Sequence, residues 1–211
     1  MSRLIDITPV VSERIGVWPG DTPYSRKINL AIADGANIDL SAVQTTVHLG
    51  AHTDAPNHYS LDGEGIAARP LDLYYGPCQV VRVSIERGER IRPTHVSLPI
   101  TAPRVLFATG TFPDPDDWNS DFASLSAELV DWLASQGVRL VGIDTPSIDL
   151  QDDKALESHG RVAAHDLAIL EGIALEDVSP GLYTLIALPL KLEDADASPV
   201  RAVLVDDGGG A

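Results

Sequence analysis

A helix that runs straight into an apolar strand is the feature that most constrains the fold of this chain. In SLSAELVDWLASQG, at residues 124–137, Leu and Trp side chains recur at helical spacing. Ser124 or Ser126 is available as the N-cap, and Gly137 as the C-terminal stop. The strand-like stretch VRLVGID follows at once. A helix joined this closely to an apolar strand predicts a mixed α/β fold.

Further strands are indicated by short segments that are rich in Val, Ile and Leu and bounded by Gly, Pro or Asp. The segments are Leu4–Ile7, Cys78–Val83, Val105–Ala108, Val138–Ile143, Tyr183–Leu190 and Ala202–Val205. A second, shorter helix is expected at Asp153–His159. No internal repeat or linker interrupts the pattern.

The length of 211 residues fits one compact domain with room for a protruding hairpin or arm. A core of this size can bury roughly 70% of the surface of the unfolded chain, so folding requires no disulfide or structural metal. We expect a single domain over residues 1–206. Residues 207–211 end in a run of glycines and are expected to form a flexible tail.

The balance of acidic and basic side chains limits the kinds of molecule that the protein is expected to bind. There are 31 acidic against 15 basic side chains, which gives a formal net charge of −16. This charge disfavours binding to nucleic acid or to an anionic membrane surface. The N-terminal residues lack the continuous apolar segment of a secretory signal, and no run of 18 apolar residues is found. The sequence therefore predicts a soluble cytoplasmic protein.

The single cysteine, Cys78, excludes an intramolecular disulfide and all sites built on Cys-x-x-Cys pairs. It lies in an apolar stretch and is interpreted as a buried strand residue. The sequence also lacks the Gly-x-Ser-x-Gly, HExxH, GxGxxG and Walker A patterns. Because there is no cysteine pair, any metal must be held by nitrogen and oxygen ligands. Because the common motifs for a serine nucleophile and for nucleotide binding are missing, metal-assisted chemistry is the remaining candidate.

The strongest chemical signal is the segment HLGAHTDAPNH at residues 48–58. It gathers three histidines and one aspartate: His48, His52, Asp54 and His58. Gly50 and Pro56 argue against a helix, and in extended chain these even-numbered positions project to one face. Because six extended residues span roughly 20 Å, a shared metal requires the chain to curl near Gly50. Imidazole and carboxylate groups are ligands for zinc, manganese or ferrous iron.

A second group of candidates lies in ESHGRVAAHDLAILEG, which offers His159, His165 and Glu171. Glu171 follows an apolar stretch, where a carboxylate is costly to bury unless a metal or another cation holds it. The residues alone do not distinguish His159 from His165 as a ligand. His95 has no chemical partner nearby in the sequence and is interpreted as structural.

Together with three segments elsewhere in the chain, these motifs resemble those of the cyclase-type metal-dependent hydrolases. Within that family, the resemblance is to the bacterial kynurenine formamidases (arylformamidases). The resemblance spans nearly the whole chain. The family pattern His-x-Gly-Thr-His-x-Asp-x-Pro-x-His is met at residues 48–58, with Ala51 in place of the commoner threonine. Three further segments contribute to the resemblance to the kynurenine formamidases: WPGDTP at Trp18–Pro23, TGTFPDPDDWNSDF at Thr109–Phe122 and GIDTPSID at Gly142–Asp149.

The resemblance implies a swivelling β/β/α fold, a homodimer and a centre of two metal ions, usually Zn²⁺, with Mn²⁺, Fe²⁺ or Cd²⁺ as substitutes. It assigns His48, His52 and Asp54 to one ion and His159 to the second, with Asp54 and Glu171 bridging. In the resemblance, the remaining site residues have other roles: His58 donates and accepts the proton, Trp18 lines the substrate pocket, and His165 is a bystander.

The expected reaction is hydrolysis of N-formyl-L-kynurenine to L-kynurenine and formate, a step of tryptophan degradation. Two alternatives stay open. One is another amide hydrolase of the family, for example one that opens the lactam of isatin, which would differ around Trp18 and Phe112. The other is a metal-binding domain without catalysis.

Overall fold

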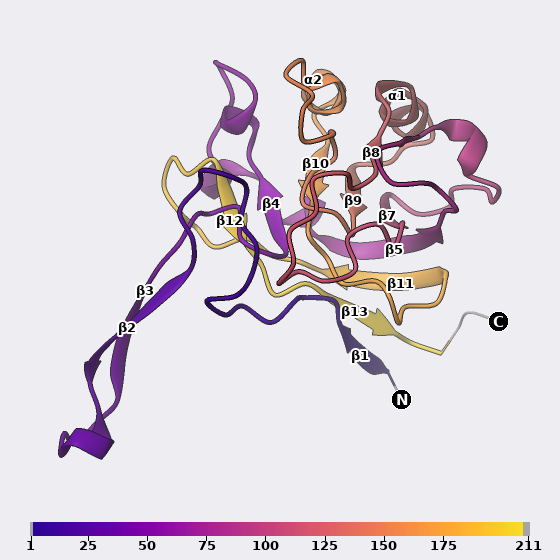
Figure 1. Cartoon of the computed structure of the whole chain (residues 1–211). Helices are drawn as coiled ribbons and strands as arrows, with labels where there is room; N and C mark the ends of the chain where they lie inside the picture. Colours follow the sequence, from indigo (N-terminus) through magenta and orange to yellow (C-terminus); the bar gives the residue numbers. More distant parts are fainter. Residues whose placement is uncertain (1, 209–211) are drawn as a thin grey trace.

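The computed structural model describes residues 2–208 and consists of one central sheet with two short α-helices (Figure 1). The sheet has seven strands in the order β1-β13-β11-β5-β7-β9-β10. Their bounds are β1 Arg3–Asp6, β5 Tyr75–Arg82, β7 Arg104–Ala108, β9 Leu140–Ile143, β10 Ala168–Leu170, β11 Gly181–Ile186 and β13 Val203–Asp206. The mixed α/β fold that the sequence predicts is confirmed.

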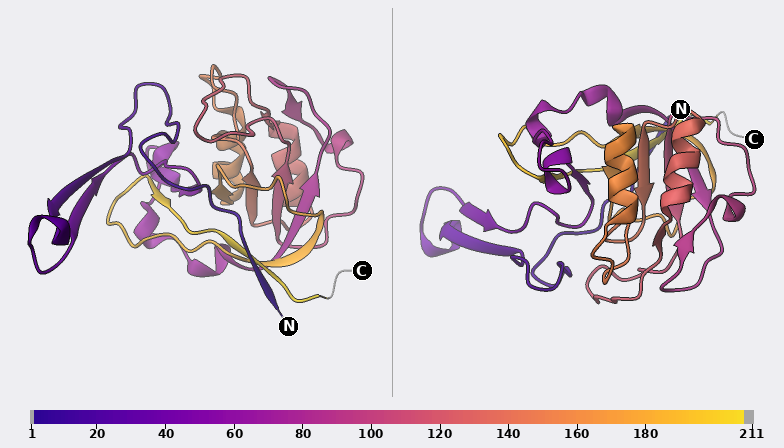
Figure 2. Two further views of the ribbon diagram at one scale, coloured as in Figure 1. Left: turned by 60° about the horizontal axis from the view of Figure 1, so that its bottom comes forward. Right: turned by 90° about the horizontal axis from the view of Figure 1, so that it is seen from above.

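The sheet has a parallel half and an antiparallel half. Strands β5, β7, β9 and β10 run parallel, whereas β11, β13 and β1 pair antiparallel. The two helices, α1 (Ala127–Ser135) and α2 (Glu157–His165), lie side by side on one face of the parallel half (Figure 2). Parallel strands covered on both faces are apolar at nearly every position, which is why β7 and β9 form continuous apolar runs.

Alternation along these strands divides the core into two layers. Val105 and Phe107 of β7 pack with Leu129 and Leu133 of α1. Leu106, one residue out of phase, joins the layer on the opposite face. This second layer includes Ala51, Ala55 and Ile173, which lie in the two segments that carry most of the candidate site.

Shorter elements complete the fold. Strand β4 (His52–Asp54) pairs with β12 (Ala197–Pro199), and β6 (Arg90–Ile91) pairs with β8 (Ser124–Leu125). Within residues 2–208, 3₁₀ turns lie at Ile32–Asp34, Pro56–His58, Ile66–Ala68, Leu71–Leu73 and Pro93–His95. The described residues contain no helix both long and apolar enough to cross a bilayer.

A two-stranded hairpin, β2 (Ser25–Leu30) with β3 (Leu40–Gln44), projects away from the sheet as an arm (Figure 1). All its strand residues are exposed, including Ile28 and Val43 at 61% and 62%. The arm is the protruding hairpin for which the chain length left room.

The first helix follows its sequence signals. The hydroxyl of Ser126 accepts a hydrogen bond from the Leu129 amide at 3.1 Å, which makes Ser126 the N-cap. Gly137, with φ of +84°, follows the last turn. Cys78 is fully buried in β5, as expected.

The second helix is displaced from its predicted position at Asp153–His159 and spans Glu157–His165. The carboxylate of Asp153 accepts a hydrogen bond from the Ala155 amide at 2.8 Å, and this local turn competes with helix. Leu156 then takes a left-handed conformation with φ of +49°. The prediction was wrong because the helix is capped from a distance, by Asp149, which accepts from the His159 amide at 3.0 Å.

Strand ends also differ from prediction. Strand β11 ends at Ile186 rather than Leu190, and β9 begins at Leu140 rather than Val138. Of the predicted tail, residues 209–211 lie outside the described residues.

Candidate metal centre

The segment at residues 48–58 reverses direction at Gly50, which has φ of +53°. This turn confirms the predicted curl and brings the Nδ1 atom of His48 to 3.0 Å from Oδ1 of Asp54. His52 and Asp54 then lie on one face of β4, while Thr53 points the other way and donates a hydrogen bond to the Ile169 carbonyl at 2.6 Å.

Glu171 reaches the same place through backbone pairing. Its amide donates to the carbonyl of His52 at 2.9 Å, and its carbonyl accepts from the His52 amide at 3.1 Å. The two side chains meet with 3.2 Å between Nε2 of His52 and Oε2 of Glu171. The Ile148 amide donates to the other carboxylate oxygen at 2.7 Å and fixes the group.

His159 completes the cluster from α2. Its Nε2 atom lies 3.4 Å from Oδ2 of Asp54 and 3.8 Å from Oε1 of Glu171. The structure thus brings together all five residues that the resemblance assigns to metal binding: His48, His52, Asp54, His159 and Glu171. Their roles as ligands stay predictions.

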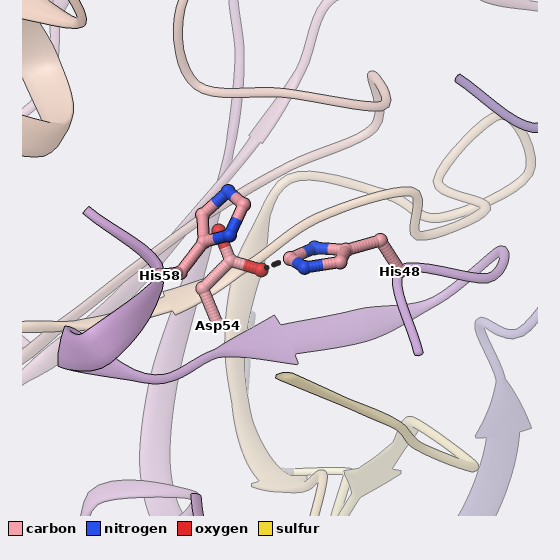
Figure 3. Close-up of side chains that lie close together, drawn as sticks. All are labelled: His48, Asp54 and His58. Atoms are coloured by element: carbon pink, nitrogen blue, oxygen red, sulfur yellow. Dashed lines mark ion pairs between the residues drawn. The ribbon is translucent and has the colours of Figure 1, made fainter. Parts of the chain in front are cut away.

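His58 lies beside this cluster. Figure 3 shows its ring and that of His48 on either side of the Asp54 carboxylate. The rings of His48 and His58 have centroids 4.2 Å apart. Ligand atoms of His48, Asp54 and His58 all lie within 4.8 Å of one another, as do those of His52, Asp54 and Glu171.

The surroundings of the Asp54 carboxylate indicate whether these residues fit a metal ion. Both its oxygens are buried and neither has a hydrogen-bond partner, yet imidazole nitrogens face them at 3.0 and 3.4 Å. A buried carboxylate without hydrogen bonds is costly unless a cation occupies the space in front of it. Donors of imidazole and carboxylate type suit Zn²⁺, Mn²⁺ and Fe²⁺. The residues present therefore fit a metal centre.

The electrostatics of the cluster also indicate a site for positive charge. Burial raises the pKa of Asp54, but the His159 and His48 imidazoles outweigh it and hold that pKa well below its usual range. Burial lowers the pKa of His159, and hydrogen bonding to Asp149 and the proximity of Asp54 outweigh it, raising the pKa to about 10. The carboxylates thus attract positive charge, which bound metal ions can supply in place of protons.

His58 behaves differently from the other histidines of the cluster. Burial lowers its pKa, and the nearby carboxylate of Asp54 offsets this only in part. Its side chain is 35% exposed. The lowered pKa favours the neutral imidazole, which is the form that can accept a proton.

Outer carboxylates orient the imidazoles, and the sequence analysis did not single them out. Asp149 contacts Nδ1 of His159 at 2.8 Å, and Asp196 contacts Nε2 of His48 at 3.0 Å. Asp149 lies between Ile148 and Leu150 in the sequence, the same apolar context that pointed to Glu171. No local signal marks Asp196.

The cluster lies in a cavity of about 570 Å³. Trp18 lines it and makes edge contacts with Trp118 and Phe122, at centroid distances of 5.7 and 6.2 Å; its role in substrate binding stays a prediction. Among the described residues, none that line the cavity is Lys or Arg. All seven predicted site residues line it: Trp18, His48, His52, Asp54, His58, His159 and Glu171.

The remaining two histidines lie elsewhere. His165 is on α2 with its Nε2 atom 2.7 Å from the Asp131 carboxylate, outside the cavity. His95 accepts a hydrogen bond from the Arg92 amide at 3.1 Å. The structure thus separates His159 from His165, which the residues alone did not.

Gly172 offers a test of how tightly the two site segments pack. It has φ of +65°, and a Cβ atom there would lie 2.2 Å from the carbonyl oxygen of Gly50. We expect Gly172→Ala to destabilise the protein by more than about 1 kcal/mol and to weaken zinc binding, because it pushes Glu171 away from the turn. Thermal unfolding and zinc titration measure both effects.

Gly88→Ala is the matched control, since Gly88 also has positive φ, at +75°, but a Cβ atom there would have nothing within 4 Å of it. Equal losses in the two variants would mean that backbone strain alone acts and that the close approach to Gly50 does not matter.

Fold and site together define an α/β protein with a candidate centre of nitrogen and oxygen ligands in a cavity that Trp18, Phe112 and Trp118 also line. The family model described as "Putative cyclase" matches residues 5–150, more than half of the chain. The chain belongs to this Cyclase family.

Solved structures of similar fold support the assignment. The chain is 27% identical to one described as a "Potential Metal-Dependent Hydrolase With Cyclase Activity", with a TM-score of 0.82 over 98% of both chains. It is 26% identical to a "predicted metal-dependent hydrolase" from Bacillus stearothermophilus, with a TM-score of 0.81 over 98% of this chain and 99% of that one. Isatin hydrolase A from Labrenzia aggregata shares the fold at 21% identity, with a TM-score of 0.81 over 97% and 93% of the two chains.

Proposed function

We propose that this Cyclase-family protein is a metal-dependent amide hydrolase that converts N-formyl-L-kynurenine and water to L-kynurenine and formate. The observation that carries the proposal is the meeting of five imidazole and carboxylate side chains, together with a fourth histidine, His58, in one cavity. The segments that resemble the formamidases, around Trp18 and Phe112, line the same cavity.

The five residues would hold two divalent ions, and Zn²⁺ is the proposed metal. When bound, such ions supply an acidified water and a Lewis acid toward the formyl oxygen. Asp54 and Glu171 each present two carboxylate oxygens to the histidines around them, so either can bridge a pair of ions.

His58 is the proposed proton carrier. It accepts a proton as water oxygen bonds to the formyl carbon, and it donates that proton to the anilide nitrogen as the carbon–nitrogen bond breaks. Its lowered pKa favours the neutral form, which can accept a proton. The products are the arylamine and formic acid, which releases its own proton to give formate.

Trp18 is proposed to stack on the aryl ring of the substrate. We expect Trp18→Ala to raise KM about 2- to 10-fold and to change kcat less, because an aromatic contact contributes roughly 0.5 to 1.5 kcal/mol to binding. Steady-state kinetics at full metal occupancy measure this.

A tryptophan that serves only the core would give another result. In that case Trp18→Ala would lower the unfolding temperature strongly while the KM of the folded enzyme stayed unchanged. Trp18→Phe keeps an aromatic ring next to Trp118 and Phe122 and should retain most of the affinity.

The test of function is the ultraviolet change on mixing the protein with N-formyl-L-kynurenine, before chelation, after chelation and after zinc is restored. Conversion that the chelator abolishes and zinc restores supports the proposal. Conversion of isatin alone would identify a lactam hydrolase, a candidate favoured by the shared fold with isatin hydrolases. No conversion of either compound at full occupancy would leave a metal-binding protein without this activity.

We also propose that the protein is a homodimer that associates through the arm. Large apolar side chains on β2 and β3 are exposed in the single chain, among them Ile28 and Val43, and apolar patches of this kind mark association surfaces. Sedimentation equilibrium should give twice the 22.5 kDa chain mass. Val43→Asp should shift the mass toward one chain, and an unchanged mass would show that the arm is not the interface.

A further inference from the structure

Asp196 lies beside the cluster because of the pairing between β12 and β4. Ala197 of β12 is opposite Asp54 of β4, and the Asp196 carbonyl accepts a hydrogen bond from the Ala55 amide at 2.8 Å. The backbone of Asp196 is thus held to the segment that carries His52 and Asp54. Its position relative to the centre is set by strand pairing rather than by a loop.

One oxygen of this carboxylate faces two imidazoles. Oδ2 of Asp196 is 3.0 Å from Nε2 of His48 and 3.6 Å from Nδ1 of His58. The Asp196 side chain is 49% exposed, whereas that of Asp54 is 1% exposed. Asp196 therefore lies at the rim of the site, next to His58 and next to His48, whose other ring nitrogen faces Asp54 (Figure 3).

A carboxylate at one ring nitrogen decides which nitrogen carries the proton. His48 has a carboxylate at each ring nitrogen, with Asp196 3.0 Å from Nε2 and Asp54 3.0 Å from Nδ1, so Asp196 fixes the orientation of this ring. At His58 it favours the proton on Nδ1 and leaves Nε2 unprotonated. The distance of 3.6 Å is longer than a hydrogen bond, and such contacts often tighten when substrate binds.

We propose that Asp196 is a positioning residue that holds the His58 imidazole with its proton on Nδ1, so that Nε2 is free to accept the proton from the attacking water. The same oxygen fixes His48 toward the metal centre, which couples the orientation of a proposed ligand to that of the proton carrier. This inference rests on the proposed function, because it assigns Asp196 a part in proton transfer.

The kinetic test compares Asp196→Ala and Asp196→Asn at full zinc occupancy, verified by metal analysis. We expect Asp196→Ala to lower kcat about 10- to 100-fold with KM changed less than twofold. Asp196→Asn keeps an acceptor oxygen and should give an intermediate kcat. An unchanged kcat, or a rise in KM alone, would overturn the proposal.

Asp194→Asn is the matched control. Asp194 is exposed in the same segment, and its φ of +55° is one that asparagine tolerates. We expect wild-type kinetics from this variant. A loss equal to that of Asp196→Asn would mean that the segment, and not the Asp196 carboxylate, is responsible.

A second readout is independent of activity. In the zinc-loaded protein, the ¹⁵N resonances of His58 should show the proton on Nδ1, and Asp196→Ala should remove this preference. A proton on Nε2 of His58 in the wild type would overturn the inference. If the wild type hydrolyses no amide, the proposed function fails, while the tautomer of His58 still reports whether Asp196 orients it.

Discussion

Asp54→Asn is expected to abolish metal binding and to lower kcat/KM on the order of 10³-fold or more. Asp54 is the only residue of the described cluster whose two oxygens are both buried and without hydrogen bonds, while His48 and His159 face them at 3.0 and 3.4 Å. A neutral amide removes the charge that balances bound cations and leaves one oxygen where there were two.

Metal analysis after dialysis against zinc, together with kinetics and circular dichroism, measures the outcome. Asparagine preserves the volume of the side chain, so the variant should fold. Asp62→Asn is the matched control, because Asp62 is exposed in the loop that follows the same segment. If Asp54→Asn retains two zinc ions per chain, Asp54 does not bridge, and the centre must be assigned differently.

The second large effect is expected from His58→Ala. We expect kcat to fall about 10²- to 10⁴-fold, the usual contribution of a general acid–base group, while two zinc ions stay bound. His58 has a lowered pKa and a partly exposed ring, as a proton carrier requires. Turnover and metal content are measured on the same sample.

The metal content decides the role of His58, because its ligand atoms also lie within 4.8 Å of those of His48 and Asp54. Loss of one ion on substitution would make His58 a ligand and contradict its assignment as proton carrier. His165→Ala is the control, since His165 pairs with Asp131 at 2.7 Å and does not line the cavity. It should leave both turnover and metal content unchanged.

Local sequence signals were reliable where the interactions are local. The N-cap at Ser126, the stop at Gly137 and the turn at Gly50 depend on residues a few positions away, and each is found as expected. The second helix was misplaced because its cap, Asp149, accepts from amides nine and ten residues further along. Strand ends shifted because pairing partners, rather than composition, decide where a strand stops.

By itself, the sequence determined the mixed α/β class and the set of imidazole and carboxylate groups available to a metal, because periodicity and residue type are local properties. The tertiary structure decided which of these groups meet. Thr53 and Ile169 are hydrogen-bonded although 116 residues apart, as are His48 and Asp196 at a separation of 148. Strand pairing brought Glu171 to Asp54 and placed Asp196 at the rim, whereas hydrogen bonds to Asp149 hold His159 of α2 in the cluster and His165 of the same helix stays outside it. These long-range contacts depend on the whole fold and on no short motif.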